Sequence, residues 1–172
     1  MSVHKRPYDE PIIMIEHNAF ENAFNRLYEE TMALIEKTAA YIDSEGKVVA
    51  RSLSAEISAL YAKEAMYLST RLMQIASQLL LLRAEREGEM SSEQIKKEIV
   101  KVSLQTPSLE FETPHWNELP EIFRQFVAHS LRLEARIKYM RAGWEAAASS
   151  TLEDENPVAK QIELLKTAFG RS

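Results

Sequence analysis

The stretch from Ser52 to Gly88 constrains the fold of this chain more than any other. It runs for more than thirty residues without a proline or an internal glycine. Gly88 stands where a left-handed C-terminal cap belongs. At about 1.5 Å per residue, such a helix is roughly 50 Å long. Its apolar residues recur at steps of three, four and seven, which marks one face of an α-helix: Ile57, Tyr61, Leu68, Leu72, Ile75, Leu79 and Leu82.

A second set of residues lies on the other side of this predicted helix. Met66, Met73 and Leu80 are seven apart, and Thr70 and Ser77 fall between them. A helix that is apolar on two sides is usually buried on both. Either other helices of the same chain cover these residues, or a partner or second copy does. Methionine adapts well to varied surfaces, although it also fills gaps in cores. We take these five residues as a candidate dimer or partner interface.

The composition is that of an all-α protein, with few glycines, prolines and β-branched runs. Four glycines in 172 residues cannot build a glycine-rich phosphate loop. The absence of cysteine excludes disulfides and thiolate metal sites and suits the cytoplasm. A net charge of −5 argues against nucleic acid as the main partner. No apolar run reaches the roughly 18 residues of a membrane span, and the N-terminus does not resemble a signal peptide.

We predict an antiparallel helical bundle of three long helices with one or two short additional helices. The long helices cover residues 18–43, 52–88 and 118–148, and the polar residues around Gly46 form the first turn. Ser91 and Gln94 match a capping box that begins a short helix. Residues 105–117, with two prolines, are predicted to be irregular.

The sequence suggests three parts. Residues 1–17 form an irregular arm, because Pro7 and Pro11 disfavour a helix. Residues 18–149 form the bundle. Residues 150–172 form an acidic linker and a short amphipathic helix. A helix this short is marginal alone, so we expect it to dock on its own bundle, on a second copy or in a partner's groove. Its docking residues are Val158, Ile162, Leu165 and Phe169.

The last long helix is locally basic within an acidic chain. Opposite charges on the same helix make a solvated surface the simplest interpretation, and a surface for an acidic partner is the alternative. The candidate partner-facing residues are Arg124, Arg132, Arg136, Lys138 and Arg141.

No set of residues predicts catalysis, a cofactor or a metal site. Glu112 and His115 have the E-x-x-H spacing of di-iron bundles, but Pro114 lies between them and breaks the helix that this spacing requires. A G-x-S-x-G motif is absent. Glu64, Arg71, Gln74 and Gln78 line a polar flank of the central helix, where they are expected to satisfy one another between helices or across an interface.

Two segments carry a resemblance to a known family. LYEETMALIEKTAAYID and YAKEAMYLSTRLMQIASQLLLLRAEREGEMS resemble the alphaproteobacterial RcdA family, regulators of CtrA degradation. The resemblance is clearest at Ser69–Gln74, at Arg83-Ala84 and at Gly88-Glu89, and it includes Leu119-Pro120 and the helix that follows. It extends over residues 20–150 or so. These motifs are helix-core patterns, so they indicate a family rather than an activity.

The resemblance implies a small helical bundle that forms a homodimer and has no catalysis of its own. It implies an adaptor that helps a ClpXP-type protease act on a cell-cycle response regulator, with a ClpX-type unfoldase, response regulators or other adaptors as partners. Because adaptor surfaces change more easily than folds, the alternative is a dimeric helical scaffold with an unrelated client. An enzyme or small-molecule sensor would require a polar, ligand-sized cavity in the bundle.

Overall fold

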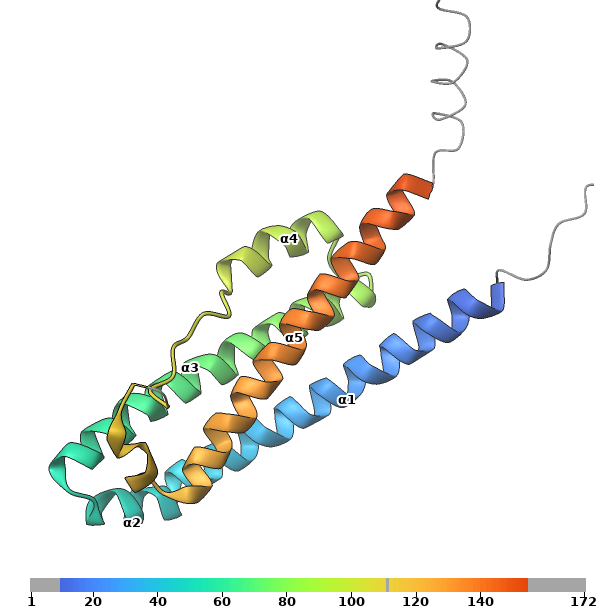
Figure 1. Cartoon of the computed structure of the whole chain (residues 1–172). Helices are drawn as coiled ribbons and strands as arrows, with labels where there is room; N and C mark the ends of the chain where they lie inside the picture. The colour runs from blue at the N-terminus through green and yellow to red at the C-terminus, as the bar shows by residue number, and fades with distance from the viewer. Residues whose placement is uncertain (1–9, 111, 155–172) are drawn as a thin grey trace, which may run out of the picture. The chain divides into compact units, whose positions relative to one another are not determined.

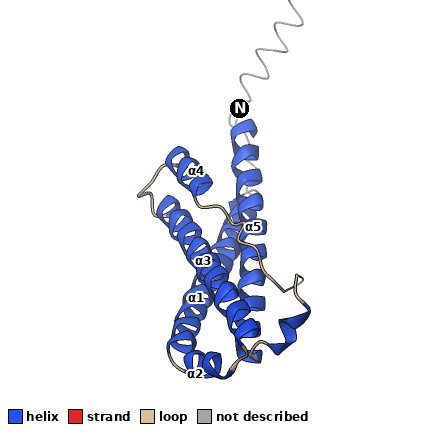
Figure 2. Cartoon of the chain, turned by 90° about the vertical axis from the view of Figure 1, so that its left-hand side faces the viewer, coloured by secondary structure: helices blue, strands red, loops and turns tan. Residues whose placement is uncertain are grey.

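The computed structural model describes residues 10–110 and 112–154, and every regular element in them is a helix (Figure 2). The prediction of an all-α bundle is confirmed. The predicted tail helix lies outside the described residues. The elements are α1 (Glu10–Asp43), α2 (Glu45–Ser52), α3 (Ala55–Arg86), α4 (Ser92–Lys101), the 3₁₀ helix η1 (Pro114–Glu118) and α5 (Glu121–Asp154).

The chain divides into two compact units, one that ends at Glu134 and one that begins at Ala135. The division falls inside α5, and the boundary expected from the sequence between residues 149 and 150 stays a prediction. A continuous helix shows no change of composition at such a point. The α3 helix, the loop after α4 and the grooves described below lie in the first unit, whereas Arg136, Lys138 and Arg141 of α5 lie in the second.

Helices α1 and α3 are antiparallel neighbours. The guanidinium of Arg86, at the end of α3, pairs with the carboxylate of Glu21, near the start of α1, at 2.8 Å. Short α2 turns the chain between the two long helices (Figure 1).

Helix α5 instead runs parallel to α3. The rings of Tyr61 and Phe123 have centroids 4.4 Å apart. Arg71, which follows Tyr61 on α3, donates at 3.0 Å to Ser130, which follows Phe123 on α5. Parallel helices require a connection that returns the chain to its starting end. Helix α4 and the loop after it provide that return (Figures 1 and 2).

The predicted apolar stripe of α3 forms the centre of the core. All seven of its residues are buried, and Leu68, Ile75 and Leu79 are fully inaccessible to solvent. Phe24 from α1 and Phe123 from α5 are buried as well. Burying a large apolar side chain contributes about 1.5–3 kcal/mol, so this stripe anchors the bundle.

Two helix boundaries differ from the predictions. Helix α1 begins at Glu10 rather than at Asn18, because Pro11 falls in the first turn, where its missing N–H costs nothing. Helix α5 ends at Asp154 rather than at Ala148. No glycine or proline interrupts the chain between Gly143 and Pro157. Residues 10–17 of the predicted arm and residues 150–154 of the predicted linker are therefore helical.

Gly46 is not a turn residue as predicted, but a buried residue within α2. A Cβ atom at this position would lie 2.6 Å from the Tyr61 hydroxyl and 2.9 Å from the Tyr41 carbonyl oxygen. The glycine therefore permits close approach of α2 to both long helices. Gly88 has a φ of 72°, which confirms the left-handed cap, and the capping box at Ser91 is also confirmed.

We predict that Gly46→Ala destabilises the protein by about 1–3 kcal/mol, because the added methyl group overpacks the junction with Tyr41 and Tyr61. Urea denaturation followed by circular dichroism measures the change. Gly143→Ala is the matched control, since nothing lies within 4 Å of the added methyl group. That control should be neutral or stabilising by up to about 1 kcal/mol, and equal effects of the two variants would contradict the packing argument.

Candidate functional site

Helix α3 carries two rows of residues with the same spacing of seven. One row is polar and buried, and the other is apolar and exposed. The rows are offset by two positions, which is about 200° around an α-helix, so they lie on nearly opposite sides. The buried row is Glu64, Arg71 and Gln78, and the exposed row is Met66, Met73 and Leu80.

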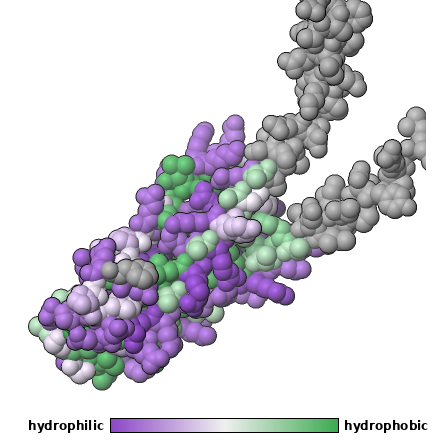
Figure 3. All heavy atoms as spheres, viewed as in Figure 1, coloured by the Kyte–Doolittle hydropathy of each residue, from purple (hydrophilic) through white to green (hydrophobic). Residues whose placement is uncertain are grey.

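We call Met66, Thr70, Met73, Ser77 and Leu80 the α3 strip. The side chains of Met66, Met73 and Leu80 are 59%, 68% and 50% exposed. No described helix of the chain covers them, so the interpretation of this row as core is wrong for the part of the chain that the structure describes. Whether a partner or a second copy covers it stays a prediction. Figure 3 shows one face of the molecule, on which patches of apolar residues interrupt a mostly hydrophilic surface.

Both hydroxyl groups of the α3 strip are already satisfied by their own helix. Thr70 Oγ1 donates to the Met66 carbonyl at 2.9 Å, and Ser77 Oγ donates to the Met73 carbonyl at 2.8 Å. A hydroxyl that is bonded to its own backbone needs no partner when it is buried. The strip can therefore enter a dry interface over about 21 Å of helix without leaving a donor unpaired.

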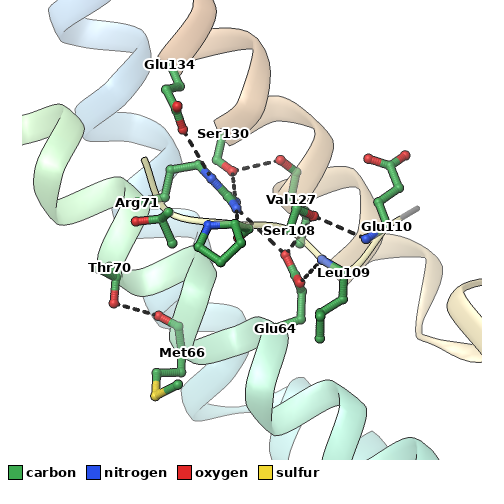
Figure 4. A network of polar contacts seen from close by, with 12 residues as sticks. Glu64, Met66, Thr70, Arg71, Ser108, Leu109, Glu110, Val127, Ser130 and Glu134 are labelled. Atoms are coloured by element: carbon green, nitrogen blue, oxygen red, sulfur yellow. Dashed lines mark hydrogen bonds and ion pairs between the residues drawn. The ribbon is translucent and has the colours of Figure 1, made fainter. Parts of the chain in front are cut away.

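On the opposite side of α3, the Arg71 guanidinium is fully buried and joins three segments (Figure 4). Its Nη1 donates to Ser130 Oγ of α5 at 3.0 Å, and its Nη2 donates to the Pro107 carbonyl at 2.7 Å. Its Nε lies 3.4 Å from the Glu134 carboxylate, and Nη2 lies 4.0 Å from that of Glu64. Burial lowers the pKa of Arg71, and the two carboxylates oppose that shift.

Glu64 is the second fully buried charge of this cluster. Its carboxylate accepts hydrogen bonds from the Leu109 N–H at 2.8 Å and from the Ser108 hydroxyl at 3.1 Å. Burial raises the pKa of Glu64, while the Leu109 and Ser108 hydrogen bonds and Arg71 lower it. Two carboxylates surround one guanidinium, so removing Arg71 would leave an uncompensated buried charge.

The polar row of α3 holds the returning loop in register. We call residues 102–109 the strap. At one end Gln78 Nε2 donates to the Val102 carbonyl at 2.6 Å, and at the other end Glu64 holds Leu109. These anchors are about 21 Å apart on α3 and about 23 Å apart along an extended strap, so the two lengths match. The start of the strap meets Gln78 and its end meets Glu64, so the strap runs antiparallel to α3. Between them lie the bonds from Thr106 to Gln74, at 2.7 Å, and from Arg71 to Pro107.

The predicted polar flank of α3 is thus confirmed as structural, with partners that were not predicted. Its partners are backbone atoms of Val102, Pro107 and Leu109 and the side chains of Thr106 and Ser108 in the strap, together with Ser130 and Glu134 of α5. Backbone groups have no sequence signature. A serine in the buried stripe of α5 was the one visible sign that a polar group from α3 meets that helix.

The basic residues predicted on α5 do not form one face. On a continuous helix they spread over about 220° of its circumference. Arg124 donates to the Leu119 carbonyl at 3.2 Å, and Arg141 pairs with Glu145 at 3.4 Å. Arg136 and Lys138 also have interaction partners. Arg132 alone of the five forms no ion pair or hydrogen bond with the described residues.

His115 lies in η1, not in an α-helix, so the E-x-x-H spacing carries no metal geometry. Its Nδ1 lies 2.6 Å from Glu118 and its Nε2 lies 3.5 Å from Glu56. The hydrogen bond with Glu118 raises its pKa. Residues 10–110 and 112–154 contain no cluster of three acidic or histidine ligands that could hold a metal ion. No helix in this part of the chain is long and apolar enough to cross a membrane.

Comparisons with known proteins give a family and a solved structure. Residues 15–169 match the family described as "protein of unknown function (DUF1465)". The crystal structure of RcdA from Caulobacter crescentus CB15 is similar to this chain with 38% sequence identity and a TM-score of 0.54. The match covers 69% of this chain and 87% of that one. No curated protein matches the chain significantly.

We predict that Arg71→Met destabilises the protein by about 3–5 kcal/mol, because it leaves two carboxylates buried without their cation. Urea denaturation at pH 7 measures the loss. Neutralising the carboxylates as well, in Glu64→Gln/Glu134→Gln/Arg71→Met, should recover a large part of it.

Arg83→Met is the control for loss of an arginine from α3. Arg83 forms an exposed pair with Glu87 at 2.8 Å, and such pairs contribute at most about 1 kcal/mol. An Arg71→Met variant no less stable than this control, or a triple variant no better than Arg71→Met, would show that the buried charges are not coupled.

Proposed function

The chain belongs to the RcdA family, and we propose that it is a non-enzymatic adaptor that assists regulated proteolysis by a ClpXP-type protease in the cytoplasm. Its client in this proposal is a cell-cycle response regulator. The observation that carries the proposal is the similarity to RcdA over most of both chains. Because function resides in surfaces rather than in a fold, the surfaces of this chain must be consistent with it.

The buried charges support a role without catalysis. A general acid or base must come within hydrogen-bonding reach of its substrate. Glu64 and Arg71, whose pKa values are shifted by burial, are fully enclosed by the strap and α5. They bind the protein's own backbone, and their role is to hold the bundle together.

The α3 strip supports a role in protein association. Three large apolar side chains are exposed in one narrow row, and their hydroxyl neighbours need no external partner. Apolar interface cores with satisfied polar groups are typical of homodimers. We propose that the strip packs against the same strip of a second copy, which gives the two-fold related contact of most dimers.

We predict that Met73→Glu weakens dimerisation without unfolding the bundle. The side chain is 68% exposed in the single chain, so a carboxylate there remains hydrated until two copies meet. Light scattering should report the mass of one chain, with unchanged helicity by circular dichroism. Val100→Glu on α4 is the matched control, because Val100 is 81% exposed and lies outside the strip. A dimeric Met73→Glu variant would show that the strip is not the dimer interface.

The adaptor role is tested by reconstituted proteolysis. We expect the protein to accelerate degradation of the response regulator by ClpXP, and to leave unchanged a substrate that the protease degrades unaided. The assay should include the response-regulator partners and other adaptors of the same cell. No acceleration, together with no binding to the unfoldase or to the response regulators, would rule out the adaptor role. A dimer with those results would favour the scaffold alternative.

A further inference from the structure

A groove of about 450 Å³ lies between α1 and α5. It is distinct from the α3 strip. Two alanines, one on each helix, leave space that larger side chains would fill. The residues that matter for its chemistry are Ala33, Leu34 and Lys37 on α1, and Phe126, Ala128 and Arg132 on α5.

The floor of the groove is apolar and fixed in place. Leu34 is buried beneath it. The ring of Phe126 packs edge-on against the ring of Tyr41, with centroids 5.5 Å apart. The groove is therefore a preformed surface, held by the same contacts that join α1 to α5.

The groove is open along its length. Its lining extends over residues 30–37 of α1 and 125–132 of α5, which is about 10 Å, or two helical turns, on each helix. Ala33, Lys37 and Arg132 on its rim are exposed. Small-molecule sites usually enclose most of their ligand, whereas an open groove two turns long suits the side chains of a helix.

The rim of the groove carries two cations that form no ion pair with the described residues, and one carboxylate, that of Glu30, lies in the same lining. Neither Lys37 nor Arg132 forms an ion pair with any residue that the structure describes. Glu30, which also lines the groove, is engaged with His129 at 2.7 Å. The chain as a whole is acidic, with a net charge of −5. Two cations without an ion-pair partner among the described residues, beside an apolar floor, therefore differ from its overall charge.

A second groove, between α1 and α3, shows the opposite arrangement. Its two arginines are already neutralised, since Arg83 pairs with Glu87 and Arg86 pairs with Glu21, each at 2.8 Å. The guanidinium of Arg86 also lies over the Phe24 ring. In the part of the chain that the structure describes, unpaired cations are therefore a feature of the α1–α5 groove that the α1–α3 groove does not share.

We propose that the α1–α5 groove binds an acidic amphipathic helix of a partner protein. Apolar side chains of that helix, at spacings of three and four, would enter between Ala33 and Ala128 and reach Leu34 and Phe126. Flanking aspartate or glutamate side chains would face Lys37 and Arg132, which favours acidic partners over basic ones. The proposal rests on the proposed protein-binding function and names the chemistry of one partner.

The test uses a synthetic amphipathic peptide of about 18 residues, long enough to become helical, with leucines on one face and glutamates beside them. Fluorescence anisotropy at low salt measures its binding to the full chain. A second peptide carries lysine at every glutamate position. We expect the glutamate peptide to bind at least about tenfold more tightly than the lysine peptide, a difference of about 1.4 kcal/mol.

Lys37→Glu/Arg132→Glu should weaken binding of the glutamate peptide at least about tenfold and strengthen binding of the lysine peptide. Lys96→Glu/Lys97→Glu on exposed positions of α4 is the charge-matched control and should change neither. Ala128→Trp, which fills the groove without changing charge, should block both peptides. Circular dichroism checks that each variant is folded.

Equal affinities for the two peptides, no detectable binding, or an unchanged affinity in the groove variants would each overturn the proposal. A change of oligomeric mass in Lys37→Glu/Arg132→Glu would also overturn it, because the occupant would then be a second copy. The peptide assay contains no protease, so its failure is separate from failure of the adaptor role. If the peptide binds, but degradation is not accelerated and neither the unfoldase nor the response regulators bind, the groove proposal stands and the adaptor role is wrong.

Discussion

The arrangement of this bundle depends on one buried guanidinium. Arg71 cannot reach water, so its donors require partners inside the protein. Its Nη1 and Nη2 donate to α5 and to the strap, and its Nε lies 3.4 Å from the Glu134 carboxylate. Glu64 on the same face of α3 fixes the strap at Leu109. This polar row determines where the returning chain lies and sets α5 beside α3 in the parallel direction. The apolar stripe supplies most of the burial, and the charges select one arrangement among those that burial alone would allow.

Much of α3 could be predicted from the sequence, because its two faces follow directly from helical periodicity. The core stripe, the Gly88 cap and the polar flank of Glu64 and Arg71 were all identified from spacing alone. What spacing cannot supply is the partner. Arg71 meets the carbonyl of Pro107 and the side chain of Glu134, and neither identity follows from a local pattern. For the same reason, the sequence could not decide whether Met73 is covered.

Failures of prediction elsewhere have related causes. Gly46 was interpreted from local turn chemistry, but it is required by the approach of tyrosines from two other helices. The basic residues of α5 were grouped by proximity in the sequence, although helical rotation disperses them. Arg132 lines the same groove as Lys37, which belongs to a different helix and is distant in the sequence. Long-range packing creates such a surface, so single-helix patterns do not reveal it.

The strap has a consequence for how the protein opens. A surface loop ordinarily detaches without disturbing the elements it connects. Here one guanidinium, that of Arg71, binds the strap through Nη2 and Ser130 of α5 through Nη1. Detaching the loop would therefore strip partners from a guanidinium and a carboxylate in the interior. The energetic cost of that step couples α4, the strap and the part of α5 around Ser130 into one cooperative unit. Local fluctuation of this connection is therefore converted into an all-or-none opening of these segments.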